Sequence, residues 1–67
     1  MSMSYKKLWK LLMDKDMKKK DLQEIAGISS ASVTKLAKNE NVNTETLQKI
    51  CNALNRDIAD IVEMVND

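Results

Sequence analysis

The sequence has no histidine, proline or phenylalanine, and it has one cysteine, one glycine, one tryptophan and one tyrosine. Because zinc sites are built from several cysteine and histidine ligands, this composition argues against a bound metal. The single cysteine, Cys51, cannot form a disulfide within the chain, and its helical spacing indicates a small buried apolar residue. Without histidine, the serines have no evident base partner. We therefore expect neither an enzyme nor a cofactor.

The sequence also lacks a long hydrophobic run. None approaches the roughly 18 apolar residues of a membrane-spanning helix, and the N-terminus does not resemble a signal peptide. These absences predict a cytoplasmic protein without a membrane partner. The chain length allows one domain, residues 1–67. A chain of this size buries only about 60% of the surface that its unfolded form exposes, so we expect no deep cleft and no small-molecule ligand.

The formal net charge of +1 is distributed unevenly. Residues 1–38 carry nine lysines and four acidic residues, whereas residues 39–67 carry two basic and six acidic residues. This asymmetry predicts one basic face and one acidic end. The basic face suits a nucleic-acid partner, whereas the acidic half and the low net charge suit a protein partner.

Hydrophobic periodicity predicts an all-α fold, a compact five-helix domain without strands. The expected helices span about Tyr5–Lys15, Lys19–Ala26, Ser30–Lys38, Asn43 or Thr44 to Leu54, and a short segment after Asp57. Ser4 and Ser29 are the expected N-caps of the first and third helices, and Gly27 should end the second. Most of the core is expected from Leu8, Leu12, Leu22, Ile25, Ile28, Val33, Leu36, Leu47, Ile50, Leu54 and Ile58.

The second and third helices are separated by three residues, Gly27, Ile28 and Ser29. Two short helices joined this tightly, with a glycine in the turn, form a helix-turn-helix. We place this unit at about residues 19–38. The spacing fits DNA binding and also plain scaffolding, and it leaves both readings open.

Hydrophobic positions and turn residues across four fifths of the chain carry a family resemblance: Leu8, Leu11, Leu12, Met17, Leu22, Ala26, Gly27, Ile28, Ser29, Val33, Leu36, Leu47, Ile50, Cys51, Ala53, Leu54, Asp57, Ile58 and Ile61. In this pattern residues 8–62 resemble the lambda-repressor-like helix-turn-helix family, also called the Cro/repressor or XRE type. The resemblance implies a five-helix domain, usually a dimer, that places its third helix in the DNA major groove. The chain departs from the family pattern at Lys18–Lys19, where Thr-Gln is frequent, at Asn39, where glycine is common, and in having no proline before the fourth helix.

By its match to the family, the groove-facing side of the third helix offers Ser30, Ala31, Thr34 and Lys35. Lys35 can donate to guanine, Ser30 and Thr34 can bond to several base edges, and Ala31 can touch a thymine methyl group. The helix has no arginine, asparagine or glutamine for a bidentate base contact. We therefore expect phosphate contacts to supply much of the affinity and DNA shape to supply part of the specificity.

The run MKKKD, residues 17–21, places three lysines at the start of the second helix, where each cation costs about 0.3–1 kcal/mol. One interpretation is a solvated surface run. The other is a DNA phosphate that faces both the ammonium groups and the backbone N–H groups, and the resemblance implies the same position for the DNA backbone. The expected phosphate contacts are Lys18, Lys19, Lys20, Ser32, Lys38 and Asn39.

Two apolar surfaces exceed what a single layer of neighbours can cover. On the first helix the wide apolar arc leaves Trp9 and Met13 short of cover. On the expected fifth helix, whose stripe is Ile58, Ile61, Val62 and Val65, the residues short of cover are Val62, Met64 and Val65. These surfaces either cover each other within one subunit or form the interface of a homodimer. A homodimer fits a palindromic operator.

The favoured function is a sequence-specific, double-stranded-DNA-binding transcriptional regulator, a small dimeric repressor. The alternative is a protein-binding antitoxin or adaptor module on the same fold. Binding to DNA that weakens steeply with added salt would distinguish the regulator.

Overall fold

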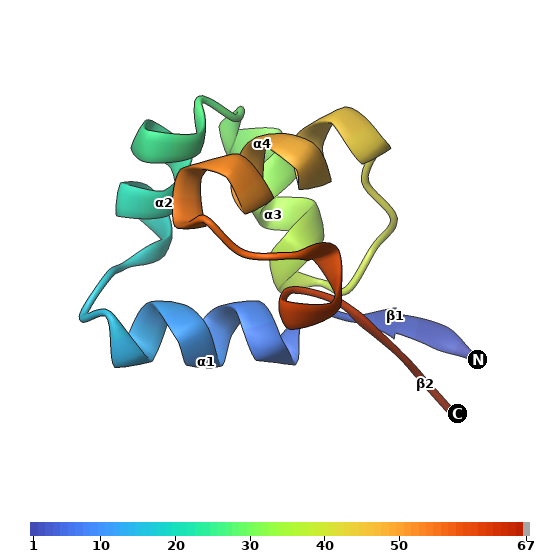
Figure 1. The fold of residues 1–67 in the computed structure, drawn as a ribbon. Coiled ribbons are helices and arrows are strands. Elements are labelled where there is room, and N and C mark those ends of the chain that lie inside the picture. Colours follow the sequence, from blue (N-terminus) through green and yellow to red (C-terminus); the bar gives the residue numbers. More distant parts are fainter. Residues whose placement is uncertain (67) are drawn as a thin grey trace.

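The computed structural model describes residues 1–66, which form four α-helices, one short 3-10 turn and a two-stranded sheet. The elements are β1 (Ser2–Ser4), α1 (Lys6–Asp14), α2 (Lys19–Ala26), α3 (Ser30–Ala37), α4 (Thr44–Leu54), η1 (Ile58–Asp60) and β2 (Glu63–Val65). In Figure 1, α1 runs along one side of the molecule, and both strands project together from the end away from α2. Asp67, one of the acids in the second half, lies outside the described residues.

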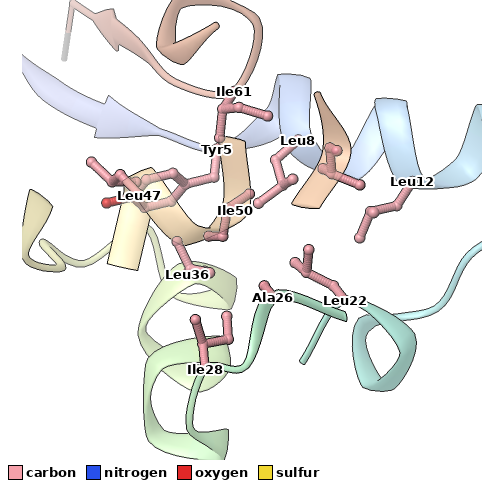
Figure 2. Packing of buried hydrophobic residues seen from close by; sticks show 11 residues of the cluster. Tyr5, Leu8, Leu12, Leu22, Ala26, Ile28, Leu36, Leu47, Ile50 and Ile61 are labelled. Atoms are coloured by element: carbon pink, nitrogen blue, oxygen red, sulfur yellow. The ribbon is translucent and has the colours of Figure 1, made fainter. Parts of the chain in front are cut away.

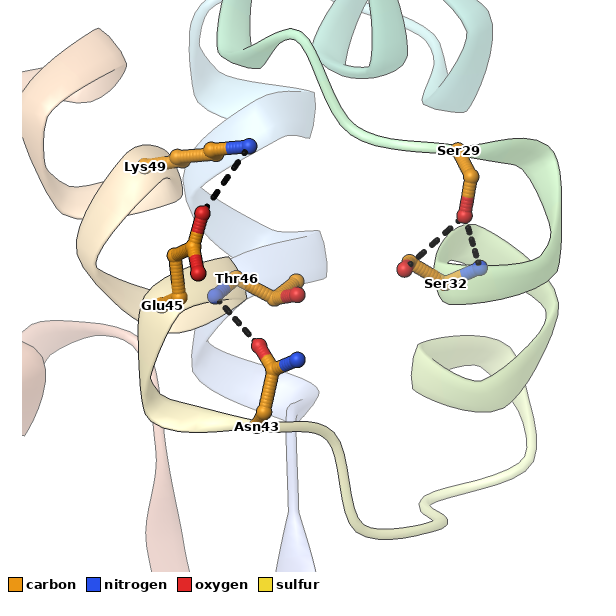
Figure 3. Close-up of polar contacts among 6 residues, drawn as sticks. All are labelled: Ser29, Ser32, Asn43, Glu45, Thr46 and Lys49. Atoms are coloured by element: carbon orange, nitrogen blue, oxygen red, sulfur yellow. Dashed lines mark hydrogen bonds and ion pairs between the residues drawn. The ribbon is translucent and has the colours of Figure 1, made fainter.

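Capping residues set the helix boundaries. Gly27 ends α2 in the left-handed conformation with φ of 67°, as expected. The Ser29 hydroxyl accepts a 3.1 Å hydrogen bond from the Ser32 amide at the start of α3, and the Asn43 side chain accepts a 2.8 Å bond from the Thr46 amide at the start of α4 (Figure 3). Ser4, the candidate N-cap of the first helix, lies one residue too early, because Tyr5 holds that position; the Ser4 hydroxyl nevertheless accepts a 3.3 Å hydrogen bond from the Lys6 amide.

The expected fifth helix is absent from the described part of the chain, and the prediction of a strand-free, five-helix fold is wrong. Asp57 caps a single 3-10 turn, after which the chain extends into β2. This strand pairs antiparallel with β1, and Met3 lies opposite Met64. Strands of three residues are too short to show an alternating pattern, and the partner of each lies at the other end of the sequence.

The core is a single cluster formed by Tyr5, Leu8, Leu12, Leu22, Ala26, Ile28, Leu36, Leu47, Ile50, Leu54 and Ile61 (Figure 2). Eight of the eleven expected residues are in this cluster, and Val33 packs against it while partly exposed. The prediction that Ile25 and Ile58 lie in the core is wrong, because these residues are 51% and 46% exposed. Leu22 and Ala26 form the inward line of α2, so Ile25 lies on its flank. Ile58 opens the 3-10 turn, and Ile61 is the residue that reaches the core.

Candidate nucleic-acid interface

The turn between α2 and α3 has the geometry of a helix-turn-helix. Gly27 adopts positive φ, which reverses the chain with little strain because glycine has no Cβ. Ile28 follows and is 8% exposed, and its amide donates a 3.2 Å hydrogen bond to the Gln23 carbonyl. The buried isoleucine and the capped α2 terminus therefore fix the direction in which α3 leaves the turn.

Helix α3 has one core face and one solvent face. Leu36 is fully buried and Val33 packs against the core. The solvent face carries the four predicted base-contact residues, all of them exposed: Ser30, Ala31, Thr34 and Lys35. The Thr34 hydroxyl donates a 3.0 Å hydrogen bond to the Ser30 carbonyl, so its oxygen remains able to accept a further bond. The structure thus brings these four side chains together on one accessible strip.

Ser32 lies at the flank of this strip and takes part in the N-cap of α3. Its hydroxyl is 3.1 Å from the Ser29 hydroxyl (Figure 3), and its side chain is partly buried. The interaction accounts for a serine at this position without invoking DNA. A hydroxyl group has one donor and two acceptor sites, so the cap leaves Ser32 some capacity for a phosphate contact.

The three lysines at the start of α2 are exposed, and two neighbouring groups reduce the cost of placing them there. The Asp21 carboxylate accepts a 2.9 Å hydrogen bond from the Lys18 amide, which sets a negative charge in the first turn. The Lys19 ammonium lies over the ring of Trp9, 4.9 Å from its centroid. An exposed cation–π contact contributes about 0.5–1 kcal/mol, similar to the cost of about 0.3–1 kcal/mol for a cation at a helix N-terminus.

Lys38 and Asn39 follow α3, and both are exposed. Asn39 adopts the left-handed conformation with φ of 57°, which asparagine tolerates better than most residues. This explains why an asparagine can stand where family members commonly have glycine. Its side-chain oxygen accepts a 3.2 Å hydrogen bond from the Tyr5 amide. Asn39 therefore has a structural role, and its side-chain NH₂ group is what remains for a phosphate.

The residues predicted for a dimer interface lie on α1 and on the segment that begins at Val62 and continues through β2. Trp9 is half-buried on α1, and Met13 is 77% exposed near the end of that helix. Val62 and Val65 are partly buried, and Met64 is 52% exposed. Because the expected fifth helix does not form, the idea of a helical stripe is wrong. Met13 and Met64 both stay open to solvent, so neither surface is fully covered within one subunit.

Cys51 packs against the core cluster and is partly buried, so it is less buried than its helical spacing predicts. It borders a shallow hollow of about 320 Å³ beside Arg56, Asp57 and Ile58. Burial raises the pKa of the Cys51 thiol, and the negative charges of Asp57 and Asp60 raise it further. Burial and these two charges thus favour the neutral Cys51 thiol over the thiolate. Within residues 1–66 no cluster of three or more Cys, Asp or Glu side chains is arranged to hold a metal ion, and no helix there could span a membrane.

Sequence reasoning missed the contact between Trp9 and Lys19. It treated the tryptophan as surplus apolar surface and the lysine as part of a charge run. The two residues belong to different helices, so no periodic spacing links them. The sequence offered one indication, a lone tryptophan on the helix that precedes the three lysines. This indication does not say which lysine the tryptophan contacts.

Comparison with known proteins agrees with this geometry. Residues 7–67 match the family model of the Cro/C1-type HTH DNA-binding domain. The fold is also similar to the crystal structure of the transcriptional regulator VanUg, Form II, with a TM-score of 0.93 and 50% sequence identity over 98% of this chain and 88% of that chain. No curated protein sequence matches the chain. The chain therefore belongs to the Cro/C1-type helix-turn-helix DNA-binding family.

Proposed function

We propose that this protein is a transcriptional regulator that inserts α3 into the DNA major groove, and that it acts as a homodimeric repressor. The observation that carries the proposal is the exposed strip Ser30, Ala31, Thr34 and Lys35 on a helix anchored by buried Leu36. The likeness to VanUg, which is described as a transcriptional regulator, supports the regulatory part. The family is in general non-enzymatic, so the proposal involves no catalysis.

Base readout in this proposal depends on few side chains. Lys35 donates to guanine, the hydroxyl groups of Ser30 and Thr34 bond to base edges, and Ala31 contacts a thymine methyl group. Such a strip allows close approach of the helix but discriminates few bases. The shape and deformability of the DNA therefore supply part of the specificity.

Phosphate contacts supply most of the affinity. The contacts come from three places on the helix-turn-helix: Lys18, Lys19 and Lys20 at the start of α2, Ser32 in the first turn of α3, and Lys38 and Asn39 after α3. Each lysine that neutralises a phosphate releases counterions. Removing one such lysine therefore makes the slope of log K against log salt less steep by about 0.9. Lys20→Ala should therefore weaken binding to all sequences about equally.

The proposed homodimer doubles this limited readout on a palindromic operator, with two copies of α3 about 34–36 Å apart. Its interface draws on one of the two apolar surfaces, either Trp9 and Met13 or Val62, Met64 and Val65. Met13 and Met64 are exposed, so Met13→Asp and Met64→Asp should leave the monomer folded. Analytical ultracentrifugation of wild type and both variants identifies the surface whose charge abolishes the dimer. A wild type that stays monomeric at high concentration would remove the dimer from the proposal.

Selection of bound duplexes from a random pool tests the function itself. We expect an enriched palindromic site and affinity that falls steeply with salt. A reporter gene placed downstream of that site should be expressed less when the protein is present. A protein that enriches no sequence, and whose weak DNA binding does not respond to salt, would instead favour the antitoxin or adaptor function.

A further inference from the structure

We infer that Trp9 is a positioning residue for DNA binding, because it holds the Lys19 ammonium at the α2 terminus, where this lysine meets a phosphate. The inference rests on the proposed function, since it assigns a role to a residue outside the expected DNA contacts. The Lys19 nitrogen lies 4.9 Å from the centroid of the Trp9 ring. This distance is within the range of about 6 Å at which a cation is attracted to an aromatic face.

Trp9 is suited to hold another side chain because it is itself held. It lies on α1, is half-buried, and packs against the core cluster. A shallow hollow of about 260 Å³, with a mainly apolar lining, separates the end of α1 from the start of α2. Trp9 and Lys19 both border this hollow, together with Leu12, Met13, Met17 and Lys18. The ring therefore presents a fixed surface beside a flexible lysine stem.

The ring contact leaves the lysine able to bind an anion. Lys19 is exposed, and its ammonium group has three N–H donors; the ring lies on one side of the group, so the donors on the other side remain available to an anion. Among residues 1–66 the Lys19 ammonium contacts the Trp9 ring and not a carboxylate. A lysine restrained in this way loses less rotamer freedom when a phosphate arrives. Lys20 is also exposed in the same turn but has no aromatic partner in the described structure, so it is the matched control.

A double-mutant cycle tests the inference. Dissociation constants for a short random-sequence duplex are measured at several salt concentrations for Trp9→Leu, Trp9→Phe, Lys19→Met and Trp9→Leu/Lys19→Met. Because a cation–π contact of this kind corresponds to a factor of about two to five in an equilibrium constant, Trp9→Leu should weaken binding by no more than about two- to fivefold. Trp9→Phe retains an aromatic face and should recover part of the loss. In the Lys19→Met background, Trp9→Leu should have no further effect.

The salt slope separates positioning from direct contact. Lys19→Met removes a charge and should lower the slope by about 0.9, whereas Trp9→Leu should lower affinity with the slope unchanged. Trp9 is the only tryptophan in the chain, so its fluorescence reports this site directly. DNA should change its emission in wild type and in Lys20→Met, and the change should be much smaller in Lys19→Met. Circular dichroism shows whether each variant is folded. If Trp9→Leu does not fold, the affinity of Trp9→Phe and the fluorescence result test the inference instead.

Two results would overturn the inference alone: Trp9→Leu leaves DNA affinity unchanged, or it weakens binding as much in the Lys19→Met background as in wild type. The second result would show that Trp9 acts through the fold or through an interface. A wild type without salt-dependent DNA binding would overturn the proposed function and the inference with it. The cycle therefore distinguishes the two failures.

Discussion

The phenolic hydroxyl group of Tyr5 donates a 2.8 Å hydrogen bond to the carbonyl oxygen of Glu40. Tyr5 is fully buried, and its backbone amide donates to the Asn39 side chain at 3.2 Å. Tyr5 therefore connects the start of α1 to the loop that follows α3 through two hydrogen bonds. This connection holds the end of the proposed reading helix against the core.

Replacing Tyr5 by phenylalanine keeps the buried ring and removes the hydroxyl bond to Glu40. We expect Tyr5→Phe to lower the free energy of unfolding by about 0.5–1.5 kcal/mol, the usual net contribution of one hydrogen bond. Urea denaturation of both proteins measures the difference. An unchanged midpoint would mean that water replaces the bond without cost.

The same substitution should alter the response to alkaline pH. Burial raises the pKa of Tyr5 above its ordinary value of 10.0, so the folded protein resists ionisation of the phenol. This contribution to stability is fully present below the ordinary pKa and is lost as pH rises through the raised pKa. The stability difference between wild type and Tyr5→Phe should therefore shrink above about pH 10. A difference that stays constant at higher pH would contradict this assignment.

Substitutions of Asn39 should separate its backbone conformation from its side-chain bond. Asn39→Gly loses the bond to Tyr5 but accepts positive φ freely. Asn39→Ala loses the same bond and adds left-handed strain of about 1–2 kcal/mol. Thermal unfolding should therefore rank alanine below glycine, and equal melting temperatures would show that the loop relaxes away from positive φ.

Buried and flanking apolar residues should respond differently to truncation. Leu36 is fully buried, so Leu36→Ala should cost about 2–5 kcal/mol, a large part of the total stability of a small domain. Ile25 is 51% exposed, so Ile25→Ala should cost no more than about 1 kcal/mol. Chemical denaturation of the two variants side by side checks the contrast. Similar costs would place Ile25 in the core despite its exposure.

Lys35 should affect specificity more than general affinity. If it donates to a guanine, Lys35→Ala relaxes the preference at one or two positions of the selected site, at about 1–3 kcal/mol for a good contact. Selection from a random pool with wild type and variant gives the comparison, and Lys38→Ala is the control for a contact to phosphate. An unchanged site with uniformly weaker binding would assign Lys35 to the DNA backbone instead.

Cys51 should react slowly with alkylating reagents. Burial and the charges of Asp57 and Asp60 raise its pKa, and the thiolate is the reactive species. Asp57→Asn removes one charge and keeps an oxygen for the cap on the Ile58 amide, so iodoacetamide should modify this variant faster at neutral pH. Asp14→Asn, at the end of α1, should react like wild type. Equal rates for all three proteins would mean that the Asp57 charge does not reach the thiol.

The sequence was sufficient for the features that depend on neighbouring residues. Gly27 and Ser29 mark the turn because left-handed backbone and N-capping have strong local preferences. The buried face of α3 followed from the spacing of Val33 and Leu36, whereas the groove-facing side was implied by the family resemblance. The helix-turn-helix was therefore predictable before any contact between distant segments was known.

The features that depend on distant residues were not predictable in this way. An apolar stripe after Asp57 fits a helix, yet Ile61 lies in the core and the residues of β2 pair with β1 at the other end of the chain. The position of Tyr5 in the core depends on acceptors more than thirty residues away, at Asn39 and Glu40.

The terminal sheet has a consequence for the order in which the molecule assembles. Ser2 pairs with Val65, so this contact closes a loop over nearly the whole chain, and the entropy of closure is offset only after the helices have packed. Two three-residue strands bury little surface, and an isolated pair of strands is marginally stable. We therefore expect the sheet to form last and to open first, so that its amides exchange with solvent while the helix-turn-helix stays intact.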